Sequence, residues 1–485
     1  CSLSKKTDKR KADKSADKVM ASTATTRRKS LHPLPILDET ALLEAFSAEG
    51  VKERHAHTIW RHVVQQREAL DSIHDKVNIP HKAHDIITTR FARTTSRVVE
   101  RSDSSDGSTT KLLIELQDGR RIETVIMRYG HVQLRSFPEQ LQLRRDDGSV
   151  EFRSSRRATV CISSQVGCQM GCTFCATGTM GLLSNLTSGE ILEQLYHANG
   201  VERIRNVVFM GMGEPLDNYE EVLKAIRAMT DARRFNLSPT RISISTVGVV
   251  KRLRQLATDA PGVSLALSLH APTQELRSVI VPTSKAWPLE RILEATDHFI
   301  RSSKKLSSRY HKNQAVTMEY VLISGVNSSE ETAHQLGKLL QPRKDDVCLN
   351  VIPYNPTDVP FDYQPPSASE TEAFGSIVRS HGITVTVRQE LGQDIASACG
   401  QLVVTREKDR ADAPTSADIE QASVARSESR WHTTQFRRWM TPTRQLIKRE
   451  RGVGALRWGV LGLSVACCAA LAVGMVVMRQ RRTVR

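Results

Sequence analysis

Three cysteines in the run CISSQVGCQMGCTFCATG have the spacing in this chain that most clearly predicts chemistry. Cys168, Cys172 and Cys175 form a C-x3-C-x2-C triplet in a loop after an expected strand. Structural zinc sites use four protein ligands, and cubic iron–sulfur clusters usually take four cysteines. Three thiolates therefore predict an iron–sulfur cluster with one open coordination position, which a cofactor would most simply fill.

A zinc site completed by a distant His or Cys is the alternative for this triplet. A second C-x2-C or an H-x3-H pair would indicate such a site. The neighbouring sequence contains neither pattern, so the residues favour the cluster.

The cysteine spacing is that of the radical-SAM superfamily, and the surrounding sequence resembles the RlmN/Cfr family of radical-SAM RNA adenosine methyltransferases, with the RlmN type as the nearest match. Five further blocks match in the same order: NVVFMGMGEPLDN (206–218), ISISTVGVV (242–250), LALSLHAPTQELR (265–277), EYVLISGVN (319–327) with NVIPYNP (350–356), and VRQELGQDIASACGQL (387–402). The resemblance covers roughly residues 35–405. A lone GxGE motif is weak evidence, whereas six ordered blocks, each at an expected strand end, are strong evidence.

The order of apolar runs in residues 158–405 predicts an α/β fold. Short β-branched runs alternate with helical segments: ATVCISS, VVFMG, RISIST, SLALSL, TMEYVLI and LNVIPY. This pattern indicates parallel strands with crossover helices. Six such strands would form the partial (β/α)6 radical-SAM barrel that the resemblance implies, with the chemistry at the carboxyl ends of the strands.

Two smaller regions precede this barrel. In residues 35–95 the apolar side chains recur at helical spacing, which predicts a small helical accessory domain. The residues alone indicate a scaffold, and the resemblance suggests contact with RNA. Residues 96–157 alternate between polar and apolar and contain Asp-Gly at 106 and 118, which predicts a β-hairpin connector. A charged inserted loop or hairpin follows Met127.

The positive charge of the chain lies in its tails. The whole chain carries +16, of which residues 1–36 contribute +7 and residues 425–485 contribute +11. The body between them is therefore close to neutral, and RNA binding there rests on the resemblance rather than on bulk charge. Residues 1–34 are expected to be a disordered basic tail or a transit-peptide remnant, and residues 406–457 a disordered basic linker.

An uncharged run near the C-terminus, WGVLGLSVACCAALAVGMVVM, occupies residues 458–478. As a helix it is long enough to span about 30 Å of hydrocarbon. It predicts a transmembrane tail anchor, in contrast to the soluble members of the family, which end soon after the ACGQL block. A buried helix is the alternative, but residues 406–457 offer little apolar surface to cover it.

Cysteine use predicts a reducing compartment. The chain has nine cysteines, three of them in the open loop, and they form no extracellular disulfide framework. We therefore expect a cytoplasmic or organellar protein, plastid or mitochondrial, that the C-terminal run would anchor to a membrane. The chain begins at Cys1 rather than Met, which predicts truncation or processing.

The resemblance implies the cofactors and their ligands. A 4Fe–4S cluster would be held by the cysteine triplet, with S-adenosylmethionine (SAM) on its open iron and two SAM molecules used per turnover. Gly213 would let the backbone approach SAM, and the Glu214 carboxylate would accept from the SAM ammonium. The remaining positions that match SAM contacts of the family are Ser245, Ser268, Leu269, His270 and Asn355.

Cys399, in DIASACGQL, is the residue that separates this family from most radical-SAM enzymes. Taken alone it would be a small buried hydrophobic residue. The resemblance implies that its sulfur first takes a methyl group from one SAM as a thiolate nucleophile. A radical derived from the second SAM then removes a hydrogen from that methyl, and the carbon adds to an adenine ring carbon, which joins enzyme and RNA covalently.

Two more residues have roles through the resemblance. Glu123, in RIETV, matches the acceptor of the ring proton, and Cys161 matches the thiol that releases the protein by forming a disulfide with Cys399. Without the resemblance, Glu123 would be an ordinary strand carboxylate.

These residues predict a radical methyltransferase acting on C2 of an adenosine in large-subunit ribosomal RNA near the peptidyl transferase centre, with tRNA as a second substrate. C8 methylation is the alternative within the family, because the motifs do not separate the two. A membrane-tethered RNA-binding iron–sulfur protein without catalysis is the alternative of another class, and the presence of Glu123, Cys161 and Cys399 argues against it. We expect a monomer that receives electrons from a flavodoxin or ferredoxin system.

Overall fold

The computed structural model describes most of the chain up to residue 402. The described residues are 31–129, 142–144, 150–152, 157–310, 316–388, 391–397 and 400–402, with the backbone alone at 142–144, 150–152, 157 and 306–310. The chain divides into two units, residues 1–405 and 406–485, and every described residue belongs to the first. The predicted linker 406–457 and nearly all of the predicted tail 1–34 lie outside the described residues.

The predicted anchor 458–478 also lies outside the described residues. Among the helices that are described, none is both long and apolar enough to cross a membrane. The anchor stays a prediction from the sequence.

A mixed sheet organises the described residues. Its parallel strands are β8 (Arg157–Cys161), β11 (Ile204–Phe209), β12 (Ile242–Thr246), β13 (Ser264–Ser268), β14 (Val316–Leu322), β15 (Val347–Pro353) and β16 (Thr384–Val387). The antiparallel strands β5 (Arg121–Tyr129), β4 (Thr109–Glu115) and β3 (Arg97–Asp103) continue it beyond β8. The strand order is β16-β15-β14-β13-β12-β11-β8-β5-β4-β3.

The parallel part agrees with the predicted α/β fold and corrects its strand count. The six strands expected from the sequence are all present and parallel, and β16 is added beside β15. Three of the four residues of β16 are exposed, so it lacks the buried apolar run by which the other strands were recognised. The described sheet thus has seven parallel strands rather than six.

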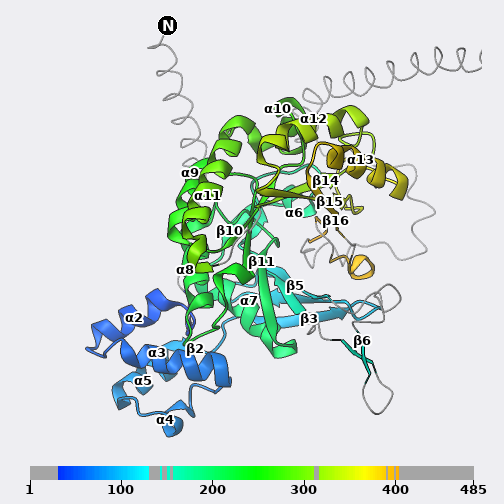
Figure 1. The fold of residues 1–485 in the computed structure, drawn as a ribbon. Coiled ribbons are helices and arrows are strands. Elements are labelled where there is room, and N and C mark those ends of the chain that lie inside the picture. Colours follow the sequence, from blue (N-terminus) through cyan, green and yellow to red (C-terminus); the bar gives the residue numbers. More distant parts are fainter. Residues whose placement is uncertain are drawn as a thin grey trace, which may run out of the picture. The chain divides into compact units, whose positions relative to one another are not determined.

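Helices connect the parallel strands and lie around them (Figure 1). The long ones are α7 (Ser188–Val201), α8 (Tyr219–Thr230), α9 (Val250–Asp259), α11 (Leu289–Tyr310), α12 (Glu330–Leu340) and α13 (Ala368–Ser380). Capping boxes begin α7, with Thr187 and Glu190, and α13, with Ser367 and Glu370. Each box satisfies backbone N–H groups that the first turn of a helix leaves without partners.

Short elements fill the loops of the sheet. They are the hairpin of β9 (Gln165–Cys168) and β10 (Gly181–Asn185), the helices α6 (Ala176–Thr179) and α10 (Gln274–Ile280), and the 3-10 turns Pro239–Arg241, Pro282–Lys285, Gln341–Arg343 and Gln393–Ile395.

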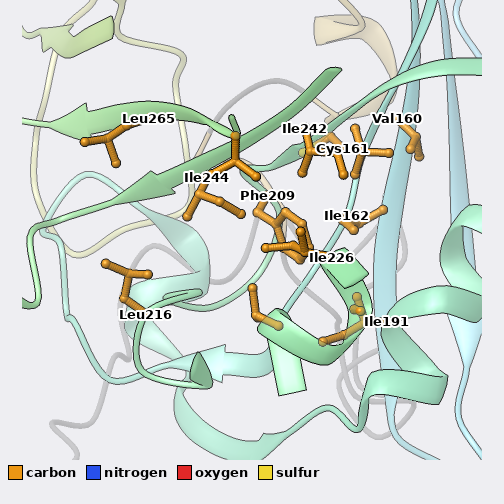
Figure 2. Packing of buried hydrophobic residues seen from close by; sticks show 14 of the residues in the cluster. Val160, Cys161, Ile162, Ile191, Phe209, Leu216, Ile226, Ile242, Ile244 and Leu265 are labelled. Carbon is orange, nitrogen blue, oxygen red and sulfur yellow. The ribbon is translucent and has the colours of Figure 1, made fainter. Parts of the chain in front are cut away.

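The core lies between the strands and their helices. Figure 2 shows Phe209 of β11 between Ile162 and Ile244, with Ile226 of α8 beside it. All four side chains are almost completely buried. Burial of each such side chain contributes about 1.5–3 kcal/mol relative to exposure. On β12, buried and half-buried residues alternate. One face of the strand therefore packs against the core, and the other face is partly accessible.

Residues 35–95, predicted as a helical accessory domain, contain α2 (Glu39–Ala48), α3 (Arg54–Arg61), a π-helical turn (His62–Gln66), α4 (Ile73–Lys76) and α5 (His81–Arg90), bounded by β1 (Leu34–Pro35) and β2 (Phe91–Ala92). These helices bury Phe46, Trp60 and Ile87. They belong to the same compact unit as the sheet. Arg234 joins the two, because its guanidinium stacks 3.6 Å above the Trp60 ring and bonds Glu39 at 2.8 Å.

The predicted connector 96–157 is a direct extension of the main sheet. Its turns fall at the Asp-Gly pairs, with positive φ at Gly107 and Gly119, as the sequence indicated. The structure has three strands here rather than a hairpin, and β5 pairs with β8. The inserted segment contains a separate pair, β6 (Gln142–Arg144) with β7 (Val150–Phe152). The remainder of that insert lies outside the described residues.

Candidate active site

A pocket opens at the carboxyl ends of the parallel strands. Eight of the residues predicted to bind the cluster or SAM line it: Cys168, Cys172, Cys175, Gly213, Glu214, Ser245, Ser268 and His270. They come from four loops or strand ends that are far apart in the sequence. Parallel strands bring these positions together because their carboxyl ends meet at one edge of the sheet.

The cysteine triplet forms one wall of the pocket. Cys168 ends β9, and Cys175 caps the short helix α6. Burial raises the pKa of Cys172 and Cys168, and the neighbouring thiols raise it further. Buried thiols that repel one another as thiolates are stabilised by bound metal, which takes up their charge.

Three neighbouring thiolates fit a cluster that keeps one iron open. Within the described residues, no group of three or more His, Cys, Asp or Glu side chains is arranged to hold one metal ion. In a cubic cluster each thiolate binds a different iron atom, so the three sulfurs need not converge on one point.

Gly213 and Glu214 form the turn after β11. Gly213 has φ +97°, and a Cβ there would lie 2.5 Å from Cβ of Gln165, so the position requires glycine. The buried Glu214 carboxylate accepts from the backbone N–H of Leu216 and of Val247, each at 2.9 Å. Burial raises the pKa of Glu214 to about 7. A ligand ammonium beside it would favour the carboxylate form.

His270 follows β13 and is held in one tautomer. Its Nδ1 accepts from the backbone N–H of Val321 at 3.1 Å, which leaves Nε2 as the protonated nitrogen of the neutral ring. Burial, reinforced by Arg277, lowers the pKa of His270 to about 3. The ring also packs edge-to-face on Phe174 of the cysteine loop. His270 is therefore a neutral hydrogen-bond donor at neutral pH.

Arg277, in α10, lies behind the pocket and ties two strand ends together. Its Nε donates to the Leu269 carbonyl at 3.1 Å, and one Nη donates to the carbonyls of Val247, at 2.7 Å, and Ser268, at 3.2 Å. The other Nη is buried without a partner. Burial lowers the pKa of Arg277 to about 10, and the nearby Cys172 and Glu214 oppose that shift. A cation next to the triplet suits a site that gathers thiolates.

Asn355 and Leu269 do not line the pocket. The side chain of Leu269 is fully buried, so any contact of this residue with SAM would have to come from its backbone. Asn355 follows β15, and its Oδ1 accepts from Nε2 of Gln393 at 2.9 Å. This bond connects a predicted SAM contact to the segment 391–397.

Cys399 lies outside the described residues, but the chain on both sides of it is described. Gly400 lines the pocket, and its carbonyl accepts from the N–H of Ala176 at 2.8 Å. Thr177 donates to the carbonyl of Leu402 at 2.5 Å. The residues after Cys399 are therefore bonded to the cysteine loop.

Glu123 and Cys161 lie on one face of the sheet, next to the pocket rather than in its lining. In the ladder, Lys111 of β4, Val125 of β5 and Cys161 of β8 stand directly opposite one another. Side chains at opposed positions share a face, as do residues two apart on a strand, so Glu123 shares this face too. Glu123 and Cys161 are both buried, and Glu123 Oε1 lies 3.1 Å from Lys111 Nζ.

Comparison with known proteins agrees with this site. The model of the radical SAM superfamily matches residues 162–336. The dual-specificity RNA methyltransferase RlmN 1 of Myxococcus xanthus is 42% identical over 322 residues, which cover 65% of this chain and 79% of that protein. The large-subunit ribosomal RNA methyltransferase N of Nitrosopumilus maritimus is 38% identical over 337 residues, covering 68% and 87%. This chain belongs to the RlmN family of radical-SAM methyltransferases.

A solved structure supports the fold of this RlmN-family chain. The crystal structure of a radical SAM methyltransferase from Sphaerobacter thermophilus aligns with a TM-score of 0.63 at 36% identity. The match covers 76% of this chain and 99% of the other. Membership in the RlmN family gives the chain a 4Fe–4S cluster and SAM as cofactors, and the buried thiols and the Glu214 turn fit them.

Three charged residues at this RlmN-family site were not predicted from the sequence. Arg277 and Glu319 fall inside the matched blocks but received no role. The carboxylate of Glu319 lines the pocket and accepts from Nδ2 of Asn350 at 2.7 Å, and burial raises its pKa. Lys111 lies outside the blocks. The signal for Lys111 was the predicted turn at Asp118-Gly119, which sets the strand register that brings it beside Glu123.

Proposed function

We propose that this chain is a SAM-dependent radical methyltransferase that methylates C2 of an adenosine in large-subunit ribosomal RNA, with tRNA as a second substrate. The observation that carries the proposal is the placement of Glu123 and Cys161 on one sheet face. Beside them, the segment around Cys399 is bonded to the cysteine loop on one side and to Asn355 on the other. The printed names of the relatives, which describe dual-specificity RNA and ribosomal RNA methyltransferases, support the substrate class.

In this proposal the pocket residues bind the two cofactors. The cysteine triplet holds the cluster, and the SAM ligands are Gly213, Glu214, Ser245, Ser268, Leu269, His270 and Asn355. Glu214 would hold the SAM ammonium, and His270 would donate through Nε2. When bound, the cluster and SAM supply radical chemistry that can activate a methyl group carried by the protein.

The remaining steps belong to residues of the chain. Cys399 takes a methyl group on its sulfur and later becomes joined, through that carbon, to the adenine ring. Glu123 then removes the ring proton. The excess electron of the adduct would leave to the cluster. The Cys161 thiolate attacks the sulfur of Cys399, so that an S–S bond forms as the C–S bond breaks, and the released carbon keeps that electron pair and takes a proton to complete the methyl group.

Mass spectrometry of RNA digests tests the proposal. Anaerobically reconstituted protein, labelled SAM, ribosomal RNA and a chemical reductant for the cluster should give labelled 2-methyladenosine. Cys399→Ala should give none, because no sulfur receives the first methyl group. Cys348→Ala is the matched control, since this half-buried thiol of β15 is outside the pocket lining, and it should retain activity. A label at C8 would contradict the C2 assignment, and unlabelled adenosine would contradict the methyltransferase itself.

We also infer a reducing compartment, cytoplasmic or organellar, a monomeric enzyme, and electron supply by a flavodoxin or ferredoxin system. The anchor at 458–478 belongs to the same set of proposals. These rest on the sequence and on the chemistry of the cluster.

A further inference from the structure

Lys111 is the charged neighbour of the proposed base. Its ammonium lies 3.1 Å from Oε1 of Glu123, and the exposed fractions of the two side chains are 16% and 5%. An opposite charge this close, away from most of the solvent, favours the ionised carboxylate. A general base must be ionised to accept a proton. The ion pair therefore favours the ionised form of Glu123, which its proposed role as a base requires.

The same ammonium reaches the segment that leads to Cys399. Lys111 Nζ donates to the carbonyl of Ala396 at 3.4 Å. Ala396 has φ +48° and ψ +47°, a left-handed conformation that is unfavourable for a residue with a Cβ. Such strained positions persist when surrounding contacts hold them. Lys111 supplies one of these contacts, three residues before Cys399.

Other contacts tie the same segment to the turn between β3 and β4. The backbone N–H of Ser105 donates to a carboxylate oxygen of Asp394 at 2.8 Å. At Gly392, with φ +69°, a Cβ would lie 2.9 Å from Cγ2 of Thr109. The β3–β4 turn and Lys111 therefore contact this segment at successive residues before Cys399, all from the same side.

We propose that Lys111 is a positioning residue that keeps Glu123 ionised and sets the segment before Cys399 against it. The inference rests on the proposed role of Glu123 as the acceptor of the ring proton. The proton moves from the ring carbon to the Glu123 carboxylate, and the electron pair of the C–H bond stays in the purine. Lys111 takes no proton in this step; its charge holds the acceptor in the receptive form.

Arg121, two residues from Glu123 on the same face of β5, pairs with Glu115 at 3.0 Å. Cys161 of β8 shares the sheet face, and α7 packs on the opposite face through Gln194, which is uncharged. Arg388 lines the pocket, and one of its guanidinium nitrogens lies 3.7 Å from Sδ of Met127 on β5. The carboxylate of Asp394 accepts a hydrogen bond from the backbone of the β3–β4 turn.

The pH dependence of methyl transfer by the reconstituted full chain tests the proposal. Lys111→Met should move the acid limb of kcat/KM upward by about one to three pH units, because loss of the cation raises the pKa of Glu123. Lys111→Gln keeps a donor for the Ala396 carbonyl but loses the charge, and it should show the same shift. Lys111→Arg should restore the wild-type limb. Arg101→Met is the control, because this cation of β3 is half exposed and pairs with Asp103.

A second readout is the covalent complex between protein and RNA. Below the shifted limb, the Met and Gln variants should accumulate a nuclease-sensitive band on a denaturing gel, since the ring proton is not removed. If the Met and Gln variants were active and kept the wild-type acid limb of kcat/KM, the inference would be overturned and the proposed function would stand. Equal loss at every pH without the band would mean that Lys111 only supports the fold. Wild-type protein that transfers no methyl to adenosine would remove the proposed function, and this inference with it.

Discussion

Burial shifts the ionisation of single groups in the pocket, and Glu214 is the clearest case. Its pKa of about 7 results mainly from burial, against which two backbone N–H groups already act. A bound ammonium would add a stronger opposing charge. In the proposed site, binding of SAM and ionisation of Glu214 are therefore coupled.

This coupling predicts a pH dependence of SAM binding. The carboxylate form binds the ammonium, so affinity should rise as pH rises through 7 and fall by about tenfold from pH 8 to pH 6. Equilibrium dialysis of labelled SAM with reconstituted protein would measure it. Glu214→Gln should bind weakly at all pH values, whereas Glu220→Gln, which changes an exposed carboxylate of α8, should follow the wild type. Constant affinity in the wild type would show that Glu214 does not bind the ammonium.

The elements that hold the site were predictable to different degrees. The six parallel strands with buried apolar runs could be recognised from residue type, and so could the two Asp-Gly turns. β16 could not be recognised in this way, because three of its four residues are exposed. The continuous sheet from β3 to β8 could not either, since pairing of β5 with β8 depends on contacts across an inserted segment.

The same division holds for the site. Predicted ligand positions in sequence motifs, such as Gly213 and Glu214, fall in the pocket because each motif ends a strand. Lys111 was missed because its role depends on strand register rather than on a motif. Arg277 was missed because a buried arginine inside a matched block gives no signal until its carbonyl partners are known.

The junction between the N-terminal helices and the sheet gives a prediction about stability. Arg234 is 3% exposed and stacks on Trp60, so Arg234→Ala removes a cation–π contact and its packing. We expect a loss of about 1–3 kcal/mol in the free energy of unfolding, measured by urea denaturation. Arg233→Ala, at an exposed neighbouring position, should change stability by less than about 0.5 kcal/mol. Equal effects of the two changes would show that Arg234 does not join these elements.

At the scale of the whole molecule, charge and hydropathy separate the catalytic body from its tails. The body between the tails is close to neutral, and the C-terminal 61 residues combine a charge of +11 with the uncharged run 458–478. A spanning helix is held by apolar transfer energy, and salt or high pH does not release it.

A fluorescent fusion carrying residues 425–485 should therefore stay with membranes through alkaline carbonate washing. The double change Leu463→Arg and Leu471→Arg should release it, because each central arginine costs about 2.5–3.5 kcal/mol on insertion. Release of the unchanged fusion by carbonate or salt would mean that the segment is peripheral.

The covalent route through Cys399 predicts that the Cys161→Ala variant traps RNA. Without the resolving thiol, protein purified from cells should carry RNA that shifts its band on a denaturing gel, and nuclease should remove the shift. The double variant Cys161→Ala with Cys399→Ala should carry none. If Cys161→Ala turned over normally with no attached RNA, Cys161 would not be the resolving thiol; if the double variant still carried RNA, the adduct would not form through Cys399.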